Sequence, residues 1–141
     1  MGALYPSQEW ADELAKVFNE SKEVQEHGKS WGEGFKGDFL FEIEPGAGLE
    51  KATYYYLNIK SGKVLDSRIY EEKPELDSGF VVTGTYGNWK PPVKGEKDFI
   101  ETIIKGELKL EGDMATVMRN AKFVRAVADA LNKVDADYLG E

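Results

Sequence analysis

Residue types on which many active sites depend are scarce or missing in this chain. The 141 residues contain no cysteine and only one histidine, His27. Without cysteine the protein has no disulfide, no thiolate nucleophile and no cysteine-ligated metal site. His27 lies in a strongly charged segment, where a lone histidine is usually solvated rather than catalytic. The composition therefore excludes thiol chemistry and gives little support for imidazole chemistry.

Long apolar runs and catalytic motifs are missing as well. No stretch of 18 apolar residues occurs and no apolar run follows a charged start, so neither a membrane-spanning helix nor a secretory signal is predicted. There is no phosphate-binding loop, no dinucleotide-binding glycine pattern and no Gly-x-Ser-x-Gly motif. The final Tyr-Leu-Gly-Glu matches neither an endoplasmic-reticulum nor a peroxisomal signal. We therefore expect a soluble, cytoplasmic protein.

Basic side chains are in the minority. The chain has 18 Lys and Arg against 26 Asp and Glu, for a formal charge of −8. This balance argues against a nucleic-acid partner, which requires clustered Lys and Arg. Glu42 and Glu44 share one face of an expected strand and are expected to face water. Tyr54–Tyr56 could act as acids, but no basic side chain is identified to pair with them in catalysis. We therefore predict that the protein is not an enzyme and needs no metal or cofactor.

The length suits a single domain spanning residues 1–141, which would bury roughly 68–70% of the surface of the unfolded chain. Ser7 is a candidate N-cap for a first helix, whose apolar face would be Trp10, Leu14, Val17 and Phe18. Alternating or β-branched apolar runs predict strands over residues 35–44, 52–60, 64–70 and 80–83. Ser61-Gly62 is expected to form a two-residue hairpin turn between the second and third of these.

The rest of the chain is expected to be mainly helical. Thr85 is a candidate cap for a short turn over 86–90 that Pro91-Pro92 terminates, and a helix is predicted over 96–105. A short strand around residues 108–110 follows. Asp113 is then the expected N-cap of a long final helix from Met114 to about Lys133.

Two apolar stripes run along this final helix. The first is Met114, Val117, Met118, Ala121, Val124 and Ala128, and the second is Phe123, Val127, Ala130 and Val134. Such a wide apolar arc indicates that the helix packs against two partners, or that part of it faces a ligand or another subunit.

This order of elements predicts an α+β fold, with one five-stranded, mostly antiparallel sheet covered on one face by helices. The helical insert between the fourth and fifth strands can cross over the sheet, which would make one strand pair parallel.

The segment from Gly106 to Met114, Gly-Glu-Leu-Lys-Leu-Glu-Gly-Asp-Met, resembles the closing motif of the sterol carrier protein 2 (SCP2) family. In that family a Gly-x-Leu-x-Ile/Leu-x-Gly-Asn/Asp segment forms the fifth strand and opens the last helix. The order of the preceding elements is also similar, from about Trp10 to Asn132. The resemblance implies a non-catalytic domain that binds and transfers fatty acids, fatty acyl-CoA, sterols or other lipids in an apolar tunnel.

Under this interpretation, the tunnel lies between sheet and helices. Its wall candidates by periodicity are Phe39, Phe41, Ile43, Tyr55, Leu57, Phe80, Trp89, Phe99, Ile103, Met114, Val117, Met118 and Ala121.

A second hypothesis is a protein-interaction module with a closed core. In that case the Phe123, Val127, Ala130 and Val134 stripe would be the surface of a homodimer or of another partner.

Overall fold

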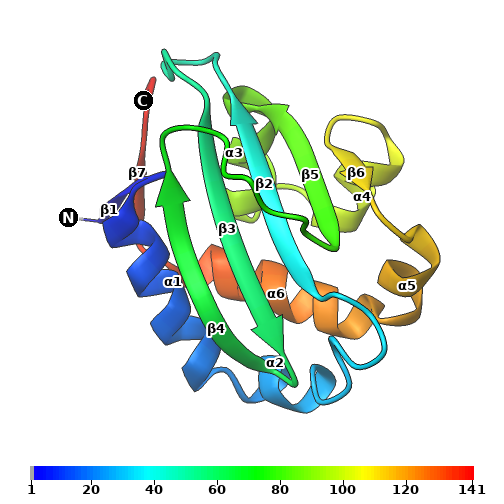
Figure 1. Cartoon of the computed structure of the whole chain (residues 1–141). Coiled ribbons are helices and arrows are strands. Elements are labelled where there is room, and N and C mark those ends of the chain that lie inside the picture. The colour runs from blue at the N-terminus through cyan, green and yellow to red at the C-terminus, as the bar shows by residue number, and fades with distance from the viewer. Residues whose placement is uncertain (1) are drawn as a thin grey trace.

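The computed structural model describes residues 2–141 as a five-stranded sheet backed by helices, with a small second sheet near both termini (Figure 1). The elements in chain order are β1 (Ala3–Tyr5), α1 (Gln8–Glu20), α2 (Lys22–His27), β2 (Asp38–Glu44), β3 (Thr53–Lys60), β4 (Lys63–Tyr70), β5 (Phe80–Thr85), α3 (Tyr86–Lys94), α4 (Phe99–Ile104), β6 (Lys109–Glu111), α5 (Met114–Arg119), α6 (Ala121–Lys133) and β7 (Ala136–Tyr138). The predicted α+β class is confirmed.

The large sheet has the strand order β4-β3-β2-β5-β6. β2, β3 and β4 form the predicted antiparallel meander, and Ser61 and Gly62 turn between β3 and β4 with φ of 53° and 78°. Positive φ at both positions is the geometry of a tight hairpin whose twist matches the strands.

One strand pair of the large sheet is parallel, but it is not the pair that the sequence suggested. The helical insert joins β5 to β6, and that pair is antiparallel; the parallel pair is β2 with β5. Residues 71–79 run across the outer face of the sheet and return the chain to the start of β2, so that β5 runs alongside β2 (Figure 1). Lys73 in this segment forms an ion pair with Glu42 of β2 at 2.8 Å. Glu42 therefore lies on the outer face as expected, but it is covered rather than freely solvated.

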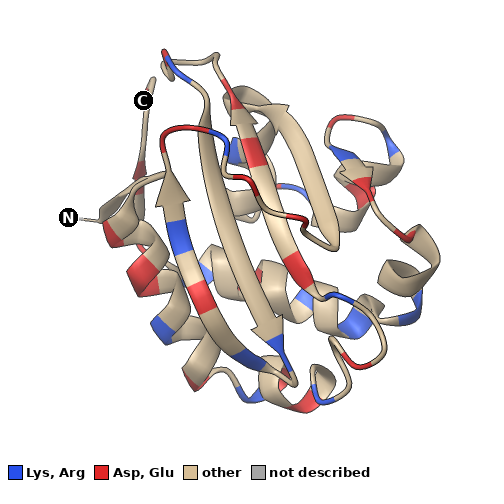
Figure 2. Ribbon diagram, viewed as in Figure 1, with Lys and Arg blue, Asp and Glu red and all other residues tan. Residues whose placement is uncertain are grey.

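The two faces of the sheet differ in chemistry. Charged residues occur along β2 and β4 of the sheet and along the helices (Figure 2). Alternate residues of the central strands point inward and are buried, namely Phe39, Phe41, Ile43, Tyr55, Leu57, Ile59, Phe80 and Val82. Several of these rings stack: Phe39 lies parallel to Phe41, with centroids 5.5 Å apart, and to Trp31, with centroids 5.6 Å apart. The period-2 pattern thus identified the core face correctly.

α3 does not end at Pro91-Pro92, as the sequence predicted, but continues to Lys94. Pro92 and Val93 are buried, so continuing the helix brings apolar surface into the core. Gly95 then ends it with φ of 86°, and the N–H of Glu96 donates to the carbonyl of Pro91 at 2.8 Å. Packing and this C-terminal cap outweigh the loss of two N–H donors inside the helix. The helix predicted over 96–105 is shorter and forms α4.

The final helix is interrupted, whereas the sequence predicted one continuous helix. Asp113 caps α5 as expected, its Oδ1 accepting from the Ala115 N–H at 3.0 Å. At Asn120 the backbone leaves the helical region, and its side-chain amide donates to the Thr116 carbonyl at 2.8 Å. A side chain that hydrogen-bonds the backbone in this way competes with helix continuation. α6 then starts in a new direction beneath the sheet and packs against α1, α2, α3 and α4 (Figure 1).

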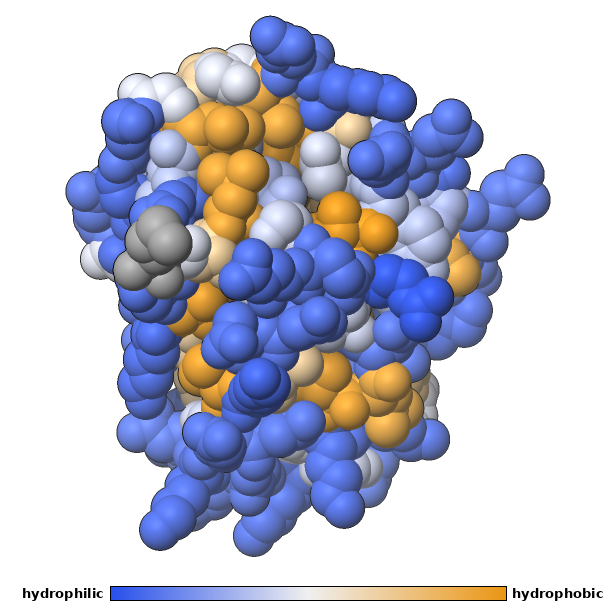
Figure 3. Space-filling model, turned by 90° about the vertical axis from the view of Figure 1, so that its left-hand side faces the viewer, coloured by the Kyte–Doolittle hydropathy of each residue, from blue (hydrophilic) through white to orange (hydrophobic). Residues whose placement is uncertain are grey.

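Neither strand of the small sheet was expected. β1 pairs in parallel with β7, so that Ala3 lies opposite Ala136 and Tyr5 opposite Tyr138. Figure 3 looks onto the side of the molecule where these strands lie, and apolar residues reach the surface there in separate patches between charged ones. We call residues 136–141 the C-terminal strap.

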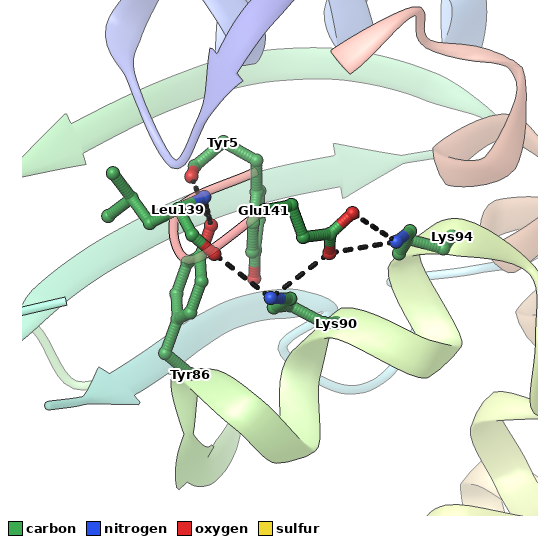
Figure 4. A network of polar contacts seen from close by, with 6 residues as sticks. All are labelled: Tyr5, Tyr86, Lys90, Lys94, Leu139 and Glu141. Atoms are coloured by element: carbon green, nitrogen blue, oxygen red, sulfur yellow. Dashed lines mark hydrogen bonds and ion pairs between the residues drawn. The ribbon is translucent and has the colours of Figure 1, made fainter. Parts of the chain in front are cut away.

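The strap is held to α3 by a polar network (Figure 4). The Tyr86 hydroxyl donates to the Tyr5 carbonyl at 2.9 Å and accepts from the Leu139 N–H at 2.8 Å. The Lys90 ammonium donates to the Leu139 carbonyl at 2.9 Å and lies 3.0 Å from the Glu141 carboxylate. The Tyr86 side chain of α3 thus links β1 to the strap through hydrogen bonds, and Lys90 forms a second link between α3 and the strap.

Replacing Tyr86 with Phe should destabilise the fold by about 1–3 kcal/mol, because a backbone carbonyl and a backbone N–H lose their partner while the ring is kept. Urea unfolding measures this, and amide exchange at Leu139 should accelerate. Tyr138→Phe is the matched control, since among residues 2–141 no hydrogen bond to its hydroxyl is formed. Equal stability of the two variants would show that the Tyr86 bridge is unimportant.

The strap should also make stability depend on pH. Hydrogen bonds from Lys94, at 2.7 Å, and from Lys90 lower the pKa of the Glu141 carboxyl below its usual 4.5. A carboxyl whose pKa is lower in the folded than in the unfolded chain adds stability above its unfolded pKa, and this is lost as the pH falls through the folded value. Hydrogen bonding to Glu141 also raises the pKa of Lys94, so the ion pair persists through neutral pH.

The melting temperature of the wild type should therefore exceed that of Glu141→Gln between about pH 5 and 9, and the gap should narrow and close as the pH falls through the lowered pKa of Glu141. Glu50→Gln, at an exposed position, is the control and should show no such gap. A gap for Glu141→Gln that is constant with pH would contradict an ionic origin.

Candidate functional site

The interior between the sheet and α6 contains two small apolar hollows. The larger, of about 20 Å³, is lined by Phe39, Phe41, Phe99, Val124, Val127, Ala128 and Leu131. The smaller, of about 10 Å³, is lined by Tyr5, Trp10, Phe41, Tyr55, Trp89, Val93 and Leu131. Each has room for about one water molecule. Neither accommodates an alkyl chain as it stands, so the lipid-sized tunnel expected from the sequence is closed in this structure.

The two hollows adjoin each other. Phe41 of β2 and Leu131 of α6 line both, so this pair of side chains forms the partition between them. The described residues that line the two hollows are all uncharged. The hollows therefore form an interrupted apolar line, from the α4 side of the molecule to the end closed by β1 and α3.

An open groove of about 390 Å³ lies on the surface beside the larger hollow. It is formed by residues 95–99 and by the exposed side of α6, with Arg125, Asp129 and Asn132. Phe99 and Ala128 line both the groove and the larger hollow. Phe99 is only 8% exposed, so its ring and the methyl of Ala128 are what separates the hollow from the surface groove.

The wall candidates identified from the sequence fall into three groups. Phe39, Phe41, Tyr55, Trp89 and Phe99 line one or both hollows. A second group belongs to the core but lines neither hollow; its members are Ile43, Leu57, Phe80, Ile103, Met114 and Val117. Met118 and Ala121 instead line an open surface depression of about 460 Å³ beside Arg119 and Lys122, where Met118 is 48% exposed.

Several wall residues were missed. Val124 and Ala128 belong to the first apolar stripe, but they were not assigned to the tunnel. Val127 was assigned to the alternative partner surface, yet it is 8% exposed and lines the larger hollow. The whole stripe of Phe123, Val127, Ala130 and Val134 is buried within the chain, so it offers no surface to a partner.

Polar atoms near the hollows are mostly satisfied within the fold. The Tyr55 hydroxyl is 2.7 Å from Ser67 Oγ, which donates to the Ala11 carbonyl at 2.8 Å. Burial raises the pKa of Tyr55, so it stays neutral. The Trp89 indole donates to the Glu42 carbonyl at 3.1 Å. These bonds fix the aromatic walls in place.

The described residues, 2–141, contain no group of three His, Cys, Asp or Glu side chains placed to hold a metal ion. In the same range, no helix is both long and apolar enough to cross a membrane. The arrangement supplies apolar surface and little else, which suits binding by hydrophobic transfer.

Comparison with solved structures supports the same fold. A crystal structure of sterol carrier protein 2 matches with a TM-score of 0.78 at 20% identity, covering 89% of this chain and 95% of that one. A conserved hypothetical protein from Thermus thermophilus, described as possibly a sterol carrier protein, matches with a TM-score of 0.82 at 17% identity, covering 99% and 98%. The apo form of sterol carrier protein 2 from Yarrowia lipolytica matches with a TM-score of 0.54 at 16% identity, covering 87% and 89%.

No curated protein sequence matches the chain. The model of the SCP-2 sterol transfer family matches residues 18–125, which span β2 to β6 and most of the helices around them. Because this match covers well over half of the chain, the protein belongs to the SCP-2 sterol transfer family.

Proposed function

We propose that this protein is a non-catalytic lipid carrier, which takes up one apolar chain between its sheet and α6. The line of hollows carries the proposal: two uncharged hollows share Phe41 and Leu131, and the larger one is separated from an open groove by Phe99 and Ala128. Membership of a sterol transfer family supports lipid as the class of ligand. Fatty acids, fatty acyl-CoA and sterols are all candidates.

The energetics favour a site that is closed when empty. A void of roughly 300 Å³, the low end for ligand sites, would cost about 7 kcal/mol at about 24 cal/mol per Å³. That is comparable with the whole stability of a domain, about 5–15 kcal/mol. A chain of sixteen methylenes contributes on the order of 13 kcal/mol gross on leaving water. The ligand therefore supplies the free energy that opens the space, and fills that space as it enters.

The entrance in this proposal is the gap between α4 and α6. α4 is a short helix whose N-cap residue, Asp98, makes no side-chain capping bond, and its helical neighbours are α3 and α6. In this proposal α4 is the part of the wall that moves, because it has only six residues and no side-chain cap at its N-terminus. Outward movement of α4 would carry Phe99 away from Ala128 and join the groove to the larger hollow.

Lipid binding is tested with protein purified from cells. Native mass spectrometry should show a co-purified acyl lipid, and a fluorescent fatty acid should be displaced by unlabelled chains. If no aliphatic ligand binds, the closed core is the functional state and the proposal is wrong.

The entrance is tested by Ala128→Phe, which places a ring between the groove and the larger hollow. Affinity for a fluorescent fatty acid should fall at least about tenfold, while the overpacking costs about 1–3 kcal/mol of stability. Ala115→Phe makes the same change at an exposed position of α5 and should leave affinity unchanged. If the Ala128→Phe variant is folded and still binds the fluorescent fatty acid with wild-type affinity, the entrance is not at Ala128 and this part of the proposal is wrong.

A further inference from the structure

Basic side chains gather at one place on this acidic protein. The chain carries 26 Asp and Glu against 18 Lys and Arg, yet the open surface depression of about 460 Å³ at the junction of α5 and α6 is lined by His27, Arg119, Lys122 and Arg125. The other described residues that line it are uncharged. Lys and Arg are visible on α5 and along the start of α6 in Figure 2. The depression is therefore a local site of positive potential on a molecule of net negative charge.

The positive charges of the depression are available to an external anion. Arg119, Lys122 and Arg125 are exposed, and among residues 2–141 neither Lys122 nor Arg125 forms an ion pair. Arg119 is the most engaged of the three, because it donates to Thr116 Oγ1 at 3.2 Å. Asp129 lies one turn beyond Arg125 on α6 and lines the neighbouring groove rather than the depression.

An apolar side chain lies among these charges. Met118 lines the depression and is 48% exposed, which is unusual for a large apolar residue of a folded protein. Methionine is flexible and adapts to irregular apolar surroundings. Cations around an exposed apolar side chain suit the interface of an anionic membrane, where the cations meet the headgroups and the apolar group enters the boundary of the acyl chains.

The depression also adjoins the proposed entrance. Arg125 lines both the depression and the groove of about 390 Å³, and it lies one helical turn before Ala128, which separates that groove from the larger hollow. A membrane that covers the depression would therefore lie beside the opening through which a lipid has to pass. An acidic protein partner would also match the charges, but it would gain nothing from this position.

We propose that the depression at the junction of α5 and α6 docks the protein on an anionic phospholipid membrane, with the entrance groove beside the membrane surface. The inference rests on the proposed function, because docking there serves the exchange of lipid. The excess of acidic side chains elsewhere is repelled by the same membrane, so this face is selected. Each Lys or Arg near such a surface strengthens binding about fivefold, so three of them give weak binding from which the protein can leave again.

Charge reversal tests the docking surface. In co-sedimentation at low salt, the wild type should bind vesicles of phosphatidylcholine and phosphatidylglycerol in equal parts. Binding should be lost at high salt, which screens exposed charges, and on pure phosphatidylcholine. Lys122→Glu should weaken binding at least about tenfold, because an attraction becomes a repulsion. Lys51→Glu makes the same change of net charge at an exposed position between β2 and β3 and should weaken binding much less.

A second measurement reports which face meets the membrane. Met118→Trp places an indole in the depression, and its fluorescence should shift to the blue when the mixed vesicles are added. Leu65→Trp, at a residue of β4 that is 61% exposed, is the matched control and should show no shift. The native Trp10, Trp31 and Trp89 are at most 2% exposed, so they contribute a constant background.

The outcomes separate this inference from the proposed function. Lys122 lines neither the hollows nor the groove, so Lys122→Glu should bind a fluorescent fatty acid in solution like the wild type. If the wild type does not bind the mixed vesicles, the inference is overturned, and an acidic protein becomes the candidate for the depression. Equal vesicle binding by Lys122→Glu and Lys51→Glu overturns it as well. Loss of fatty-acid binding in the wild type itself would instead contradict the lipid carrier.

Discussion

The high free-energy cost of empty apolar volume determines most of this structure. The inner face of the sheet carries several large aromatic side chains, and they could enclose an empty channel only at a cost comparable with the stability of the domain. The rings stack instead. Trp31, Phe39 and Phe41 lie nearly parallel, and α6 closes the space beneath them. What remains of a channel is two hollows separated by Phe41 and Leu131.

The two ends of the line of hollows differ in how strongly polar contacts hold them closed. The end at β1 and α3 is fixed by the Tyr86 bridge and by the ion pairs of Glu141, which hold the C-terminal strap against α3 (Figure 4). On the outer face, Lys73 and Glu42 hold the crossing segment in place. Among residues 2–141, the side-chain contacts at the opposite end, around α4, are the surface pairs of Lys97 with Glu107 and of Lys105 with Glu101, and a hydrogen bond from the Asn88 amide to the Glu107 carbonyl at 3.1 Å. Exposed pairs of this kind contribute little, so the molecule is firmly closed at one end and weakly closed at the other.

Local pattern was enough to predict the central part of the fold. Period-2 alternation identified the inward residues of β2 and β3, and the capping residues Ser7, Thr85 and Asp113 were correctly identified because each cap is made within three residues. Non-local effects were missed. β1 and β7 are three residues each and owe their existence to pairing with each other across nearly the whole chain. α3 passes two prolines because its far end is buried, and no local rule shows that burial.

The wall residues of the candidate site were likewise predictable where they depend on local pattern, and not where they depend on contacts between distant segments. Phe39, Phe41 and Tyr55 could be identified because a strand shows its inner face in its sequence. Tyr5, Trp10 and Val93 could not be assigned to the wall, since they belong to three separate elements, β1, α1 and α3, that are distant in the sequence. Asn120 redirects the last helix, and beyond it residues of both stripes, Val124 and Ala128 of the first and Val127 of the second, line the larger hollow. A one-dimensional pattern gives the two stripes but not the change of direction that brings both to the hollow.

A site that binds by hydrophobic transfer alone would accept many chains of similar length. One methylene more or less changes the binding free energy by only about 0.8 kcal/mol, which discriminates weakly between ligands. Selectivity then has to come from polar atoms, and those are costly to leave unpaired in a dry interior. Around the hollows nearly all such atoms are satisfied within the protein, which removes them from recognition. Contacts between such walls and a ligand would therefore depend on the buried apolar area more than on the chemical identity of the ligand.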